Sequence, residues 1–159
     1  MALSDNLVAY VPLTANDLPN TTNGHTFSAS GAAYDAASPG PAWEITATDG
    51  YISASDVTEN VPITLAICVY VPSSAPGVVT LIGRVLDDTN YFNVYMESGG
   101  TTVKARARSG GSAGDATSSG SIAGSVFNNF AGIFSSSTSR QLYINGTVGS
   151  VDTTSISPS

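Results

Sequence analysis

The strongest constraint on the fold is a strict alternation of side-chain type along residues 63–71. Ile63, Leu65 and Ile67 begin a series of aliphatic residues at every second position, whereas small or mixed side chains occupy the positions between them. Because successive side chains of a strand point to opposite faces of a sheet, this pattern predicts a strand with one face in a core. The mixed face is expected to be exposed or to line a shallow groove.

Shorter patterns of the same kind recur along the chain, separated by turn residues. Strands are predicted at residues 7–13, 43–48, 51–54, 78–84, 91–97, 102–108, 127–134, 141–144 and 147–152, with a short one around 25–28. The rest of residues 14–41 and the Gly/Ser-rich residues 109–120 are expected to be loops. Many short strands joined by tight turns, such as the one predicted at Asn145-Gly146, are typical of a β-sandwich or barrel.

The composition agrees with this interpretation. The chain has 16 Gly and 8 Pro, and only 11% of its residues are charged, so it is poor in the side chains that favour helices. A chain of 159 residues is long enough to bury its own core. The sequence therefore predicts one all-β domain covering residues 1–159, with almost no helix.

Charge and cysteine content restrict the partners. The net charge of −7 argues against a nucleic-acid partner, because phosphate contacts need clustered cations. Cys68 is the single cysteine, so no disulfide can form within the chain. Neither a signal peptide nor an apolar run long enough to span a membrane is evident. We therefore expect synthesis in a cytoplasm and no membrane partner.

Five segments carry a family resemblance. They are LVAYVPL at residues 7–13, DGYIS at 49–53, ITLAICVYVP at 63–72, FNNFA at 127–131 and RQLYING at 140–146. In this order they resemble laminin-G-like domains of the concanavalin A-like superfamily, which implies a two-sheet antiparallel jelly-roll sandwich. Such domains usually continue after the Asn-Gly hairpin, so the resemblance implies that the last strands are missing: either the sequence is a fragment, or the first strand is left with an open edge. An edge left open in this way would favour strand pairing with another chain.

The same superfamily includes glucanases, whose motif places an aspartate between two nearby glutamates. A retaining glycosidase needs two carboxyl groups about 5–5.5 Å apart. The glutamates here, Glu44, Glu59 and Glu97, are isolated from one another, and the single histidine, His25, has no assignable partner. We therefore expect no enzymatic activity.

A basic stripe runs along residues 102–108. Lys104, Arg106 and Arg108 alternate with small apolar residues, so a strand would project all three cations from one face. One interpretation is a solvated outer face that discourages edge pairing. The other is a docking patch for an acidic protein surface or an anionic glycan.

An aromatic set forms a second candidate site. Tyr70, Tyr91, Asn93 and Tyr95 are expected on strand faces, where rings and an amide can stack on a sugar and hydrogen-bond it. Ordinary cross-strand pairing explains the same residues equally well.

One turn is a candidate calcium site. Asp87, Asp88 and Asn90 can supply oxygen ligands, and the family resemblance allows calcium in loops. The same residues are also common in hairpin turns. We expect no metal and no other cofactor, with these three residues as the calcium candidate.

The opening segment, MALSDNLVAY, resembles the start of bacteriophage structural proteins that contain this domain. The resemblance implies a non-catalytic structural or decoration protein of the virion, on a capsid, head fibre or tail. Its expected partners are other virion proteins or copies of itself, with weak binding of a host-surface glycan. The alternative is a carbohydrate-binding module or lectin of a bacterial or phage adhesion protein.

Overall fold

A computed structural model describes residues 27–36, 42–45, 51–54, 61–71, 77–118 and 122–159. The chain contains two compact units, Met1–Thr58 and Glu59–Ser159. The described residues contain strands and no helix, as the sequence predicts, and none of them forms a helix able to cross a membrane. That residues 1–159 form one domain stays a prediction.

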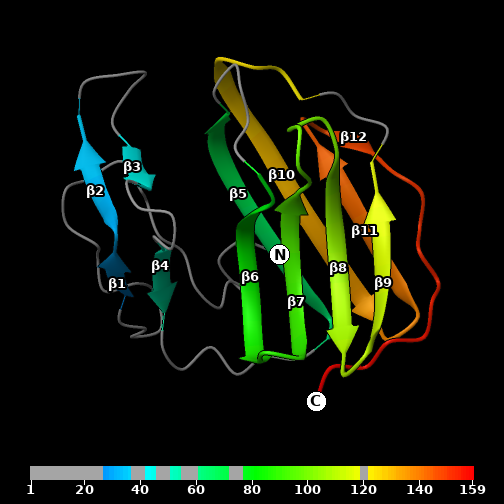
Figure 1. Cartoon of the computed structure of the whole chain (residues 1–159). Coiled ribbons are helices and arrows are strands. Elements are labelled where there is room, and N and C mark those ends of the chain that lie inside the picture. The colour runs from blue at the N-terminus through cyan, green and yellow to red at the C-terminus, as the bar shows by residue number, and fades with distance from the viewer. Residues whose placement is uncertain (1–26, 37–41, 46–50, 55–60, 72–76, 119–121) are drawn as a thin grey trace, which may run out of the picture. The chain divides into compact units, whose positions relative to one another are not determined.

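The first unit contains two antiparallel pairs of short strands (Figure 1). The pairs are β1 (Phe27–Ser30) with β4 (Tyr51–Ala54), and β2 (Ala32–Asp35) with β3 (Ala42–Ile45). Phe27 and Ser28 of β1 fall in the short strand predicted around 25–28, whereas Ala29, Ser30 and all of β2 fall in the predicted loop, so the loop prediction is wrong for these residues. Their Ser- and Ala-rich sequences carry little apolar alternation, and they become strands by pairing, β1 with β4 and β2 with the next strand, β3. The predicted strand at 7–13 and His25 lie outside the described residues.

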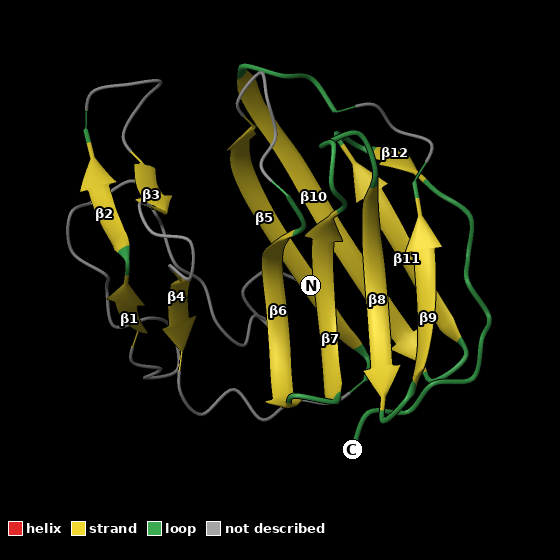
Figure 2. Cartoon of the chain, viewed as in Figure 1, coloured by secondary structure: helices red, strands yellow, loops and turns green. Residues whose placement is uncertain are grey.

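The second unit contains two four-stranded antiparallel sheets (Figure 2). One sheet has the order β12-β11-β10-β5, with bounds Thr147–Val148, Ser139–Ile144, Val126–Ser136 and Ile63–Val71. The other has the order β6-β7-β8-β9, with bounds Val79–Asp87, Asn90–Met96, Val103–Ser109 and Ser112–Thr117. Strand β10 contacts β7 and β8 across the interface, which confirms the predicted two-sheet sandwich.

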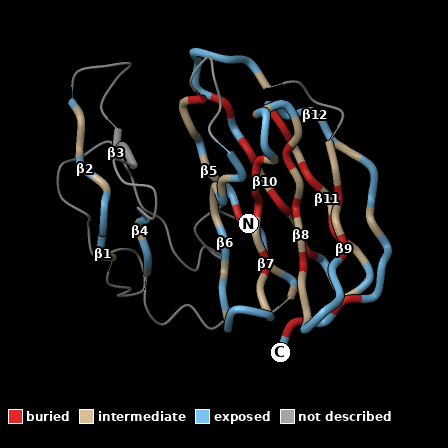
Figure 3. Tube along the Cα trace, viewed as in Figure 1, coloured by how far each residue is buried: buried red, intermediate tan, exposed pale blue. Residues whose placement is uncertain are grey.

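The core lies between these two sheets, where Figure 3 shows the buried positions of β7, β8, β10 and β11. Phe92 and Phe134 meet edge to face across it, with ring centroids 5.2 Å apart. Gly132 lets β10 approach the opposite sheet, since a Cβ there would lie 2.7 Å from Val94 Cγ2. On β5, Leu65 is only 8% exposed whereas Ala66 is exposed, so the alternation seen in the sequence is confirmed.

Strand β9 corrects a second loop prediction, since Ser112–Thr117 lies within residues 109–120. Its sequence, SAGDAT, has no strong strand formers apart from its final threonine. Gly114 and Ala116 are nevertheless buried, and the strand pairs along its whole length with β8. Pairing with a neighbouring strand therefore outweighs local propensity here.

The residues after β12 pack against the sandwich without forming a long strand. The strand predicted at 147–152 is shorter in the structure, and Asp152 makes only an isolated bridge to Arg140. Ile156 is buried in the core, and its backbone N–H donates to the Ser137 carbonyl at 2.8 Å.

Candidate functional site

The outer face of the β6–β9 sheet collects most of the predicted site residues. Strands β7 and β8 pair so that Tyr91 lies opposite Arg108, Asn93 opposite Arg106, and Tyr95 opposite Lys104. The basic stripe and three members of the aromatic set therefore share one surface. The fourth, Tyr70, lies on β5 in the other sheet and packs edge to face on Phe127, with centroids 5.6 Å apart.

Acidic side chains on the same face pair with two of the three stripe cations. Arg106 donates through Nε and Nη2 to the two oxygens of Asp115, each at 2.7 Å. Lys104 Nζ lies 2.5 Å from Glu97 and 3.8 Å from Asp115. Such charge-assisted pairs satisfy the cations within the sheet. This pairing favours a solvated outer face over a docking patch for anions.

Arg108 interacts differently from the other two cations. Its Nε donates to the Gly110 carbonyl at 3.1 Å, and its guanidinium lies 5.9 Å from the centre of the Tyr91 ring. A long hydrogen bond of 3.5 Å from Nη1 reaches the Tyr91 hydroxyl oxygen. Hydrogen bonding and charge from Arg108, with a smaller effect of Arg106, lower the pKa of Tyr91.

Tyr95 offers no free ring face to a sugar. It is only 6% exposed, and Arg106 lies over it with its guanidinium carbon 4.6 Å from the ring centre. Burial, followed by the negative charge of Asp115, raises the pKa of Tyr95 to about 12. Within the aromatic set, Tyr91 and Asn93 are therefore the members placed to meet a ligand on this face.

These two residues line a hollow of about 300 Å³ on the outer side of β6 and β7. We name it the Asn93 hollow; its lining is Thr80, Val85, Asp87, Asp88, Tyr91 and Asn93. Gly83 pairs with Asn93 in the sheet, and a Cβ on Gly83 would lie 3.1 Å from Asn93 Cβ. Because Gly83 has no side chain, β6 presents only backbone beside Asn93 Cβ at this point.

Sequence reasoning missed Thr80, Val85 and Gly83. The available signal was Gly83 inside a strand pattern, because a glycine there often marks a bulge or a place where a ligand or another backbone comes close to the strand. The structure indeed has irregular pairing between Thr80 and Ile82 and between Val85 and Asp87. These irregularities shape the strand beside the hollow.

Two acceptors in the hollow lack partners. The Oδ1 atom of Asn93 is buried and has no hydrogen bond, which is uncommon for a buried polar atom. At the rim, the Asp88 carboxylate makes no hydrogen bond or ion pair with any described residue. Val85, by contrast, contributes an apolar side chain that is 69% exposed.

The other carboxylate at this turn, Asp87, is already hydrogen-bonded. Its Oδ1 accepts from the N–H groups of Thr89 and Asn90 at 2.7 and 2.8 Å, and its Oδ2 accepts from Asn90 Nδ2 at 2.8 Å. The Asn90 side chain, followed by the Thr89 backbone, lowers the pKa of Asp87 to about 2. Turn formation therefore accounts for the Asp87-Asp88-x-Asn90 spacing. No group of three His, Cys, Asp or Glu residues suited to a metal occurs among the described residues.

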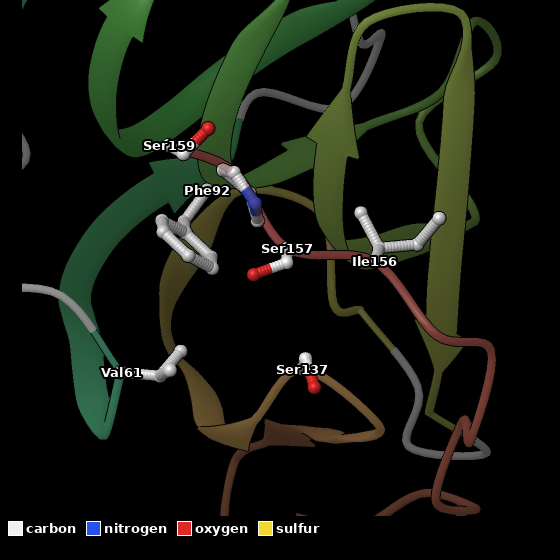
Figure 4. A pocket seen from close by; sticks show the side chains of 7 residues that line it. Val61, Phe92, Ser137, Ile156, Ser157 and Ser159 are labelled. Carbon is white, nitrogen blue, oxygen red and sulfur yellow. The ribbon is translucent and has the colours of Figure 1, made fainter.

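A second hollow, of about 210 Å³, lies at one end of the sandwich. Figure 4 shows Val61, Phe92, Ser137 and Ser157 around it. The described residues of its lining are apolar residues and serines, and none of them has a titratable side chain. This hollow is a packing gap beside the core and offers no group for acid–base chemistry.

Two carboxylates on the outer face of the β6–β9 sheet, Glu97 and Asp115, could be considered as a glycosidase pair. Glu97 and Asp115 both contact Lys104, so two carboxylates do lie near one another. Burial acts to raise the pKa of Asp115, but the hydrogen bonds and charge of Arg106 outweigh it, and the pKa is lowered. A glycosidase acid needs a raised pKa, so this pair suits a structural role. The side chains of Glu44 and Glu59 lie outside the described residues.

The family of the chain follows from a comparison with family models. The laminin-G-like model described as "Concanavalin A-like lectin/glucanases superfamily" matches residues 46–159, more than half of the chain. No curated protein and no solved structure matches the chain. Domains of this kind often bind carbohydrate and are typically non-catalytic. The antiparallel two-sheet sandwich and this match show that the chain belongs to the laminin-G-like family of the concanavalin A-like superfamily.

Proposed function

We propose that this protein is a non-catalytic carbohydrate-binding domain and that the Asn93 hollow holds the sugar. The carrying observation is that one shallow site combines an amide side chain, Asn93, with an exposed apolar side chain, Val85. A sugar ring presents hydroxyl donors on its edge and C–H groups on its faces. Sites of this mixed kind, with a few placed polar groups in an apolar setting, suit small ligands.

The energetic argument rests on Asn93. A hydrogen bond between the Asn93 amide and a ligand hydroxyl would contribute about 0.5–1.5 kcal/mol. Gly83 leaves the approach open, since its missing side chain would otherwise contact Asn93. Tyr91 supplies a second polar group and a ring beside it.

A glycan array with two variants of the hollow tests this proposal. Wild-type protein is expected to show saturable, sugar-competed binding, which Gly83→Ala and Asn93→Ala each weaken. Gly111→Ala is the matched control, because a Cβ at Gly111 meets nothing within 4 Å. Sugar binding that both hollow variants retain in full would place the ligand elsewhere and contradict the proposal.

As a biological setting, we propose a decoration or structural role on a bacteriophage particle, with other virion proteins or further copies of this chain as partners. The opening resemblance supports this, as does the uncharged outward face of β5 and β10. That face consists of Thr64, Ala66, Cys68, Tyr70, Phe127, Asn129, Ala131 and Ile133. An uncharged face can pack against another protein without removing charges from water.

The virion proposal has its own test. Purified particles of the phage that encodes the chain are expected to contain it in a fixed ratio to the capsid protein, measured by quantitative mass spectrometry. Its absence from particles that are otherwise complete would refute the virion role. Carbohydrate binding would be unaffected by that outcome.

A further inference from the structure

We propose that Asn145 is a modification site that the fold masks. Its side-chain amide is held in place in the folded protein and is lost as ammonia only after the β11–β12 hairpin opens. Asn145-Gly146 forms the turn of that hairpin. Asparagine followed by glycine is the sequence most prone to this deamidation, because glycine has no side chain to hinder its backbone nitrogen. The proposal depends neither on carbohydrate binding nor on a virion role.

The reaction is an attack of the Gly146 backbone nitrogen on the side-chain carbonyl carbon, Cγ, of Asn145. A bond from that nitrogen to Cγ forms, and the bond from Cγ to Nδ2 breaks. Ammonia leaves after it gains, through solvent, the proton that the Gly146 nitrogen loses. Water then opens the resulting five-membered imide. Its attack on Cγ gives aspartate, and its attack on the former main-chain carbonyl gives isoaspartate, so both products carry a carboxylate in place of the amide.

Burial does not protect this turn. Asn145 and Gly146 are both exposed, so water reaches the reacting groups. Their φ angles, 50° and 81°, are both positive, as a two-residue type I′ turn requires, and Ile144 pairs with Thr147 across it. Protection of Asn145 must therefore come from the contacts that hold its side chain.

Three hydrogen bonds hold Asn145 to β10. Its Oδ1 accepts from the backbone N–H of Asn129 at 2.9 Å, and its Nδ2 donates to Asn128 Oδ1 at 2.9 Å. Its own backbone N–H donates to the Asn129 carbonyl at 2.9 Å. Ring closure needs Cγ to rotate onto the Gly146 nitrogen, and the two side-chain bonds hold it toward β10 instead. The rate of deamidation is therefore set by the fraction of molecules in which this hairpin is open.

The product does not fit the place that the amide occupied. Asn128 is fully buried, and its Oδ1 accepts from the Ala123 N–H as well as from Asn145 Nδ2. A carboxylate at position 145 has no donor, so the second bond is lost and two acceptors face each other. Isoaspartate also lengthens the two-residue turn by one backbone atom, which disturbs the pairing of Ile144 with Thr147. Deamidation therefore weakens the hairpin irreversibly and leaves a covalent record of its opening.

Deamidation kinetics in folded and unfolded protein test the masking. The protein is incubated at one slightly alkaline pH, with and without enough guanidinium chloride to unfold it by circular dichroism. Peptide mapping by mass spectrometry then follows aspartate and isoaspartate at position 145. We expect conversion to be at least about tenfold slower in the folded protein, because only the opened fraction reacts.

The second Asn-Gly sequence, Asn23-Gly24, calibrates the unfolded rate, since both sequences should convert at similar rates in denaturant. Equal rates at Asn145 in folded and unfolded protein would overturn the masking. A rate at Asn145 that stays far below that of Asn23 in denaturant would overturn it too, because the protection would then come from local sequence.

Two variants test the effect of the product. Asn145→Asp places a carboxylate against Asn128, whereas Asn129→Asp adds the same charge at an exposed position of β10. Hydrogen exchange at the Ala123 N–H, which donates to Asn128 Oδ1, reports on the contact directly. We expect this exchange to be at least about fivefold faster in Asn145→Asp and within about twofold of wild type in Asn129→Asp. Equal exchange in the two variants would overturn the weakening of the hairpin by deamidation.

Discussion

The guanidinium of Arg140 and the carboxylate of Asp152 form an ion pair inside the second unit. The Arg140 side chain has no exposed area and that of Asp152 is 18% exposed. Arg140 Nη2 also donates to the carbonyls of Ser137 and Thr154, at 2.9 and 2.7 Å. One buried cation therefore holds the residues that follow β12 against the end of β11.

Replacing Arg140 by leucine is expected to lower the free energy of unfolding by about 3–5 kcal/mol, because it leaves the Asp152 charge uncompensated. Urea denaturation followed by circular dichroism measures the change. Arg108→Leu is the control, since Arg108 is only half-buried and has no acid partner among the described residues. Similar losses in the two variants would contradict a special role for Arg140.

Gly114 is expected to tolerate no side chain. A Cβ there would lie 1.7 Å from Arg140 Nη1 and 2.6 Å from Asp152 Oδ2. Gly114→Ala must displace this pair, so we expect a loss of about 1–3 kcal/mol, as for other overpacked sites. Gly111→Ala, measured in the same denaturation series, should change stability by less than about 0.5 kcal/mol. A stable Gly114→Ala protein would show that the guanidinium can move at little cost.

Asn128 is expected to be required for the fold of the loop before β10. It is fully buried; its Nδ2 donates to the Ala123 carbonyl at 2.8 Å, and its Oδ1 accepts from Ala123 N and Asn145 Nδ2. Asn128→Leu leaves these partners unsatisfied and should cost about 2–4 kcal/mol in thermal or chemical unfolding. Asn129→Ala, on the exposed side of the same strand, should cost much less, and equal costs would contradict this assignment.

The Arg106–Asp115 pair predicts a dependence of stability on acidic pH. The pKa of Asp115 in the folded protein lies below its ordinary value of 3.8. The pair therefore contributes its stability above that value, and the contribution is lost as pH falls through the lower folded pKa. Urea unfolding at a series of pH values should show a steeper acid loss in wild type than in Asp115→Asn.

Asp88→Asn is the control for that experiment, because it changes the net charge equally but removes a carboxylate without a described partner. Above pH 3.8, Asp115→Asn should be less stable than wild type by about 1 kcal/mol, the upper range for a partly exposed pair. Identical pH profiles for wild type and Asp115→Asn would refute this contribution.

Much of the sandwich could be predicted from local patterns. The alternation in residues 63–71 identified both the strand and its buried face. The basic stripe was predicted to project its three cations from one face of a strand, and in β8 they do lie opposite the buried Val103 and Ala105. These predictions hold because a strand with one buried face requires a side-chain period of two. The family resemblance likewise depends on such patterns, and the match over residues 46–159 confirms it.

Strands β2 and β9 and the second half of β1 could not be predicted in this way. Their sequences are rich in Ser, Ala and Gly, and the information that makes them strands lies in their partners. The candidate site could be predicted only in part, because some of its residues are brought there by strand pairing. Tyr91 and Asn93 were expected on one face, but Gly83 and Val85 enter the site only through the pairing of β6 with β7.

The sequence alone determined the fold class and the alternating faces, because period-two patterning acts locally along each strand. Only the tertiary structure decided which charges are available for binding. Lys104 and Arg106 form a basic stripe in the sequence, yet Glu97 and Asp115 neutralise them once β7, β8 and β9 are side by side. Pairing energies depend on distances of a few ångströms between residues far apart in sequence, and strand register fixes those distances.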